Sequence, residues 1–74
     1  MDARTARRLV YRIMKEDPYC CVLETRRCKS SRYVFYELLV EDTRTGCPFV
    51  LTSPKDWEVR KRAAAETASL TEEV

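Results

Sequence analysis

The side chains of this chain that could do chemistry are mainly arginines and lysines, and their densest group lies in the stretch ETRRCKSSRY at positions 24–33. Guanidinium and ammonium groups bind carboxylates and phosphates, and a guanidinium often does so through two parallel hydrogen bonds. The cluster therefore predicts contact with an acidic ligand, either a protein surface or a nucleic acid. The candidate binding residues of this stretch are Arg26, Arg27, Lys29 and Arg32.

A second basic group lies near the N-terminus. Apolar residues recur there at three- and four-residue spacing, which predicts a helix that is capped by Asp2 and stopped by Pro18. The opposite side of this helix carries Arg4, Arg7, Arg8, Arg12 and Lys15. Most of these arginines lie in the first two turns, where the helix dipole disfavours cations, so helix stability does not account for them. From this group we take as candidate binding residues Arg4, Arg8 and Arg12.

Catalysis has little support in the sequence. The chain has no histidine, no glycine-rich phosphate loop and no serine or cysteine nucleophile with a recognisable base nearby. Glu37, within an apolar run, is the one carboxylate whose pKa its surroundings could shift, and a solvent-facing or lysine- or arginine-paired glutamate is the simpler interpretation. We expect a protein without enzymatic activity and without a cofactor.

Four cysteines raise the alternatives of a disulfide framework and a metal site. Cys20 and Cys21 are adjacent, and adjacent strand residues point to opposite faces, so these two thiols do not bridge one another. The chain has no C-x-x-C pair, and a zinc site without histidine would need Cys28 and Cys47 to converge with the other two. We expect small buried thiols that stay reduced, and no metal.

Length and composition predict one folded domain over residues 1–74. Apolar residues make up 45% and charged residues 35% of the chain, which is a globular composition with a highly charged surface. Residues 1–33 have a net charge of +5 and residues 34–74 a net charge of −3, so the basic surface comes from the first half. The chain shows neither the roughly 18 apolar residues of a membrane span nor the pattern of a signal peptide, and we expect a cytoplasmic protein.

Two runs after the first helix, 19–27 and 32–41, are rich in strand-forming residues. In the second run one face carries Val34, Tyr36, Leu38 and Val40. We expect helices to cover that face and this strand to be central. Gly46 closes a polar turn that calls for a positive φ angle, and residues 47–52 form a third strand at an edge of the sheet, because Pro48 cannot donate to a ladder.

The stretch SPKDWEV predicts the start of a second helix, with Ser53 as N-cap, Pro54 in the first position and Asp56 near a capping-box position. We expect this helix to fray at about 71–74. Its two apolar lines, which should wrap around the sheet, are Trp57, Ala64 and Ala68, and Val59, Ala63, Leu70 and Val74. The predicted fold is α+β, in the order helix, three-stranded antiparallel sheet, helix (αβββα), with both helices packed on one face of the sheet.

This order of elements resembles the double-stranded RNA-binding domain. The resemblance covers most of the chain but is one of topology. It implies that the loop after the first strand, here RRCKSSR at 26–32, and the Arg-rich side of the first helix face duplex RNA. The family places a lysine cluster at the start of its last helix, whereas here Lys55 is followed by Asp56 and Glu58. The glycine- and histidine-containing loop signature of that family is also missing.

The sequence leaves two function classes open. The first is a regulator or inhibitor that docks on a protein partner with an acidic surface, as small phage- or plasmid-encoded inhibitors do, anti-CRISPR proteins among them. The second is a nucleic-acid-binding protein that uses the basic loop 26–32 and the first helix, with Tyr11 or Tyr33 available for base stacking. A homodimer, formed through the third strand or through the helical face that carries Trp57, is a further alternative.

Overall fold

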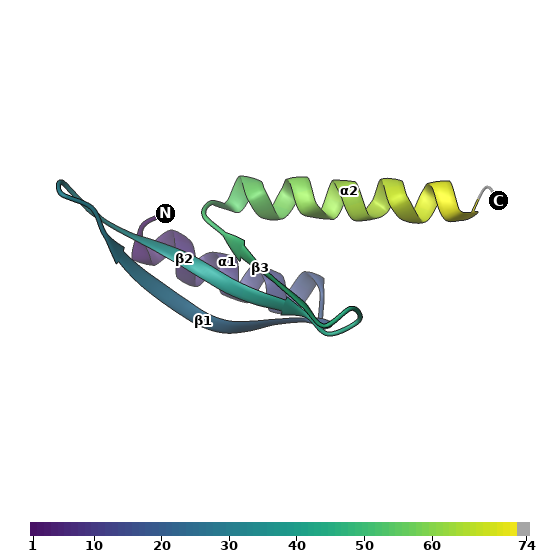
Figure 1. Cartoon of the computed structure of the whole chain (residues 1–74), viewed down its shortest axis with the longest axis horizontal. Helices are drawn as coiled ribbons and strands as arrows, with labels where there is room; N and C mark the ends of the chain where they lie inside the picture. Colours follow the sequence, from purple (N-terminus) through teal and green to yellow (C-terminus); the bar gives the residue numbers. More distant parts are fainter. Residues whose placement is uncertain (73–74) are drawn as a thin grey trace.

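The computed structural model describes residues 1–72 and characterises the side chains of residues 1–63. The elements follow the order α1 (Ala3–Glu16), β1 (Cys20–Lys29), β2 (Val34–Asp42), β3 (Cys47–Leu51) and α2 (Pro54–Glu72). The three strands form one antiparallel sheet in the order β1-β2-β3, so β2 is central as predicted. The predicted αβββα order is confirmed (Figure 1). The fraying expected at 71–74 falls partly on residues 73–74, outside the described residues.

Helix α1 begins and ends where its sequence indicates. The Asp2 side chain accepts a hydrogen bond from the backbone N–H of Thr5 at 2.7 Å, which satisfies one of the free N–H groups of the first turn. The helix ends before Asp17, whose backbone N–H donates to the Ile13 carbonyl at 2.9 Å, and Pro18 prevents its continuation. The buried side chains of α1 are Ala6, Leu9 and Ile13.

One core holds the two helices and the sheet together. Leu38 and Val40 of β2 are fully buried, at 0% exposure. The buried residues packed with them are Ala6, Leu9, Ile13, Cys20, Leu51 and Trp57. Because α1, all three strands and α2 contribute to this cluster, both helices lie on the same face of the sheet, as predicted. Val34 is an exception to the predicted covered face, because it lies near the end of the β1–β2 hairpin, outside the core, and is exposed.

The other face of the sheet carries no helix within residues 1–72. Phe35, Glu37 and Leu39 of β2 point to this open sheet face, since they alternate with the buried Leu38 and Val40. The register places Cys28 opposite Phe35 and Arg26 opposite Glu37, so these two β1 residues share the open face.

Helix α2 contacts the rest of the protein through its first turns and then extends beyond the sheet (Figure 1). Trp57 is buried, whereas Val59 is exposed, so the expected second apolar line is wrong at Val59. The reason is that Val59 follows Trp57 by two residues, about 200° around the helix, so it lies on the side of α2 opposite the buried Trp57. The expected contributions of Ala64, Ala68, Leu70 and Val74 fall outside the side chains that the structure describes. The Asp56 carboxylate accepts hydrogen bonds from the backbone N–H and hydroxyl of Thr52, at 3.0 and 2.7 Å.

The two hairpins differ in how well the sequence predicts them. Gly46 has a φ of +73°, as expected for the β2–β3 turn. In contrast, the predicted basic loop 26–32 is wrong, because β1 continues to Lys29 and the turn is short. Ser30 closes it: its backbone N–H donates to the Tyr33 carbonyl at 2.9 Å, and its Oγ accepts from the N–H groups of Arg32 and Tyr33. Strand β1 can continue through charged residues because this part of the hairpin lies outside the core, and both of its faces are exposed to solvent.

Candidate functional site

The structure divides the predicted basic residues into three groups, and the first is structural. Arg12 donates from Nε to Glu16 at 2.7 Å and from Nη2 to Glu58 of α2 at 3.0 Å. Lys61 of α2 also forms an ion pair with Glu16. These contacts join α1 to α2. The hydrogen bonds from Lys61 and then from Arg12 lower the pKa of Glu16 to about 2. The Arg12 guanidinium therefore lies in an ion-pair cluster between the two helices, and its role in binding a partner stays a prediction.

Arg26 forms the second group by itself. It lies on the open sheet face, opposite Glu37, and its Nη2 is 3.8 Å from the Glu24 carboxylate. Its side chain thus points to the face opposite the helices and lies among acidic neighbours. Arg26 does not join the arginines of α1 in one surface, because consecutive residues of a strand alternate between the two faces.

The third group lies on the side of the helices or at the hairpin turn, and within the described residues these side chains have no ion pair with a carboxylate. Arg27 is opposite Tyr36 and Lys29 is opposite Val34, so both share the face that α1 covers further along the sheet. Arg32 lies in the turn. We define the basic surface as Arg4, Arg7, Arg8, Arg27, Lys29 and Arg32; all six residues are exposed. Of the seven predicted site residues, five belong to it.

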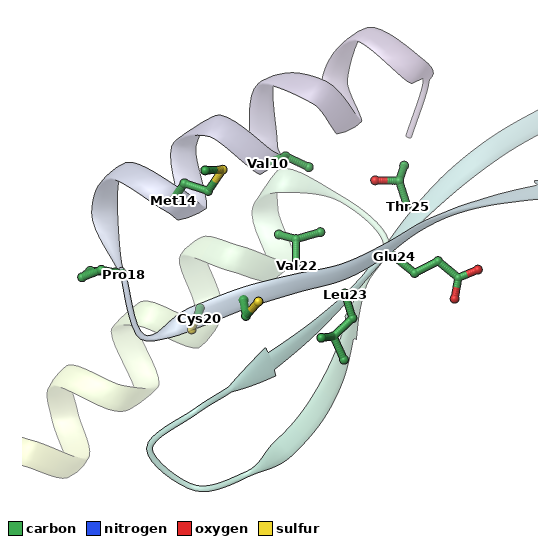
Figure 2. Close-up of a pocket in the computed structure, with 9 residues that line it drawn as sticks. Val10, Met14, Pro18, Cys20, Val22, Leu23, Glu24 and Thr25 are labelled. Carbon is green, nitrogen blue, oxygen red and sulfur yellow. The ribbon is translucent and has the colours of Figure 1, made fainter.

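A groove runs between α1 and β1. Two cavities of about 580 and 560 Å³ lie along it, and both are lined by Val10, Met14 and Thr25, so they form one continuous α1–β1 groove. Figure 2 shows Val10 and Met14 of α1 facing Val22 of β1, while Leu23 points away from the helix. Its lining is mainly apolar, and Tyr11 and Met14 are 67% and 61% exposed, respectively.

Two residues of the basic surface, Arg7 and Arg27, adjoin one end of this groove. Arg7 and Tyr36 line the same cavity, and Arg27 is the strand partner of Tyr36. The two arginines therefore flank the end nearest the β1–β2 hairpin, while Pro18 and Cys21 line the other end. Arg7 was missed as a candidate site residue, although its spacing gave a signal: Ala3, Arg7, Val10 and Met14 follow one helical stripe.

The cysteines and carboxylates form no metal-binding cluster in the part of the chain that is described. No three Cys, Asp or Glu side chains come together there as a metal site would require. All four thiols are free, and the expectation that they are buried holds for Cys20 but is wrong for the exposed Cys21 and Cys47. Burial and then the neighbouring Glu37 raise the pKa of Cys28.

Among residues 1–72, no helix has the length and apolar character needed to cross a membrane. Protein-family models, curated proteins and solved structures were compared with this chain, and none of them matches it.

Proposed function

We propose that this protein is a non-enzymatic binding module that acts as a regulator or inhibitor by docking on a protein partner with an acidic surface. The observation that carries the proposal is the position of Arg7 and Arg27, two residues of the basic surface, at one end of an exposed apolar groove. Protein interfaces combine an apolar centre, often with Met and Tyr, with a polar and charged rim. Met14 and Tyr11 would form part of the apolar centre, and Arg7 and Arg27 part of the charged rim.

The charges have a separate role in this proposal. Arg4, Arg8, Arg27 and Lys29 add positive potential that speeds encounter with an acidic surface and excludes basic ones. Since these side chains are exposed and have no ion pair among the described residues, they can bind acidic groups of another protein without breaking contacts that hold the fold. A phage-encoded inhibitor of a host complex is one kind of protein that fits this description.

The alternative is a nucleic-acid-binding protein that uses the same cations. The unpaired arginines favour it, but the aromatic residue of the hairpin does not. The Tyr33 ring packs against Phe35, with ring centroids 5.7 Å apart, and Phe35 lies on the open sheet face. Arg27 and Lys29 lie on the other face of the same hairpin. A nucleic-acid strand that contacts Arg27 and Lys29 would therefore not stack its bases on Tyr33 at the same time.

A pair of charge-reversal variants tests the proposal. Arg8→Glu/Arg27→Glu changes the basic surface, and the matched control Lys55→Glu/Arg62→Glu makes the same change in net charge at two exposed residues of α2. Partners are captured from cells with the unmodified chain, and each is then purified and titrated against all three proteins. We expect a protein whose binding the first variant abolishes and the control retains. Equal binding by both variants would contradict the proposal, as would a partner that consists of nucleic acid alone.

A further inference from the structure

The outer edge of β1 is a second feature of the same site. Both β1 and β3 are edge strands, as the expected central place of β2 in a three-stranded sheet implies. β1 has ten residues and no proline, whereas β3 has five and contains Pro48. A bulge between Val22 and Glu24 interrupts the register of β1, so its regular part runs from Glu24 to Lys29. An unpaired regular edge of this kind is a template for another strand.

The backbone of this edge is turned outward at defined residues. The Tyr36 N–H donates to the Met1 carbonyl at 2.7 Å, and the Tyr36 carbonyl accepts from the Met1 amino group at 3.4 Å, so both groups point away from β1. In an antiparallel ladder, when the N–H and C=O of one residue point away from the partner strand, those of the directly opposed residue also point away from the first strand. This outward orientation recurs at every second residue. Arg27, opposite Tyr36, therefore turns its N–H and C=O to the open edge, and so do Thr25 and Lys29. No hydrogen bond within residues 1–72 occupies these groups.

The side chains beside this edge specify the ligand. Thr25, Arg27 and Lys29 all point to the helix side, since their partners Leu38, Tyr36 and Val34 do. A strand added to β1 would place alternate side chains on this side, next to the same residues. Those beside Thr25 would enter the α1–β1 groove, which is apolar, and those beside Arg27 and Lys29 would meet cations. The ligand that fits is an extended segment with apolar and acidic side chains two residues apart.

Resting on the proposed function, we propose that the partner contributes an extended acidic peptide segment of about six residues, which adds to β1 as a fourth strand. This mode of recognition takes affinity from main-chain hydrogen bonds and specificity from alternate side chains. A second copy of the chain fits the edge less well. If two copies paired through β1 near Arg27, their Arg27 and Lys29 side chains would lie close to one another and repel. Pairing nearer the N-terminal end of β1 would be interrupted by the bulge between Val22 and Glu24.

The probe is a set of peptides selected from a random 12-residue phage-displayed library on the full chain. We expect the selected sequences to share alternating apolar and acidic residues. A selected peptide, labelled with fluorescein, is then titrated by anisotropy after N-methylation of single residues. Methylation at alternate positions, where the N–H would face β1, should weaken binding about tenfold, while methylation at the positions between should not. Arg27→Glu should weaken the same peptide, and Lys55→Glu should not.

A protein variant adds an independent readout. Thr25→Pro removes an outward N–H and leaves the β1–β2 ladder bonds in place, so circular dichroism should be unchanged while peptide affinity falls. Peptides that bind the basic surface but tolerate N-methylation at every position would overturn strand addition and leave the proposed function standing. Failure to select any such peptide would overturn strand addition too. Self-association that Thr25→Pro abolishes would assign the edge to a second copy instead.

Discussion

Replacing Glu16 with glutamine tests the assignment of Arg12 to the structure rather than to the binding surface. The Glu16 carboxylate joins Arg12 of α1 to Lys61 of α2, and Arg12 continues to Glu58. An amide keeps the shape of the side chain but removes the charge that holds the two cations. The variant should therefore loosen the contact between the helices without creating a cavity.

The expected cost follows from the exposure of these side chains. Glu16 is 29% exposed, Arg12 36% and Lys61 38%, so solvent screens the two pairs substantially. Partly exposed ion pairs each contribute about 0.2–1 kcal/mol, which gives about 1 kcal/mol for Glu16→Gln. In a domain of this size such a loss lowers Tm by about 4–8 °C. Urea unfolding followed by the fluorescence of Trp57 measures the free energy of unfolding directly.

The pH dependence makes this prediction specific. The pKa of Glu16 in the folded protein is about 2, below its ordinary value of 4.5, so its stabilisation is present above pH 4.5 and is lost as the pH falls toward 2. The difference in unfolding free energy between the wild type and Glu16→Gln should be largest at pH 6–7 and should vanish near pH 2. The other carboxylates with lowered pKa, Asp2, Asp42 and Asp56, titrate in both proteins and cancel. A difference that is absent at pH 7, or that persists unchanged at pH 2, would refute the assignment.

The remaining predictions concern the core, the thiols and the arginines of α1. Trp57→Ala should cost about 3–5 kcal/mol, a large part of the about 4–11 kcal/mol expected for a chain of this length, and circular dichroism at 37 °C should show substantial unfolding. Iodoacetamide at pH 8 should label Cys47 rapidly in the folded protein and spare Cys20, because burial and then Asp17 raise the pKa of Cys20 to about 11; mass spectrometry that finds equal labelling would contradict the structure. Arg12→Ala should lower Tm by calorimetry, whereas Arg8→Ala, one turn earlier and without an ion pair among the described residues, should leave it within about 2 °C.

The elements that the sequence predicts well are those set by local chemistry. The Asp2 cap, the apolar stripe of α1 and the stop at Pro18 all act within a few residues, and Gly46 is required by its own φ angle. The alternation along β2 predicted the buried face that carries Leu38 and Val40, and the expected central place of this strand is confirmed.

The parts that failed depend on residues far apart in the chain. The Arg12–Glu16 pair has the local i,i+4 spacing of helical ion pairs, but Arg12 also donates to Glu58, 46 residues later, and nothing in the local sequence marks that second partner. The extension of β1 through Lys29 arises from pairing with Val34–Glu37, so the basic stretch looked like a loop when read alone. Because β1 extends this far, Arg26 lies on the open sheet face. Arg7 lines the α1–β1 groove because β1 packs beside α1, and the sequence alone does not show that packing.

The measurement that tests the central claim most directly is a gel-shift titration of the full chain with duplex DNA, duplex RNA and single strands. It is made at low and at physiological salt, with Arg8→Glu/Arg27→Glu as the control. If the basic surface and the α1–β1 groove serve a protein partner, the unmodified chain should show only the weak low-salt attraction of any basic patch. Sub-micromolar binding that falls steeply with salt and disappears in the variant would contradict the claim and identify the same arginines as phosphate ligands.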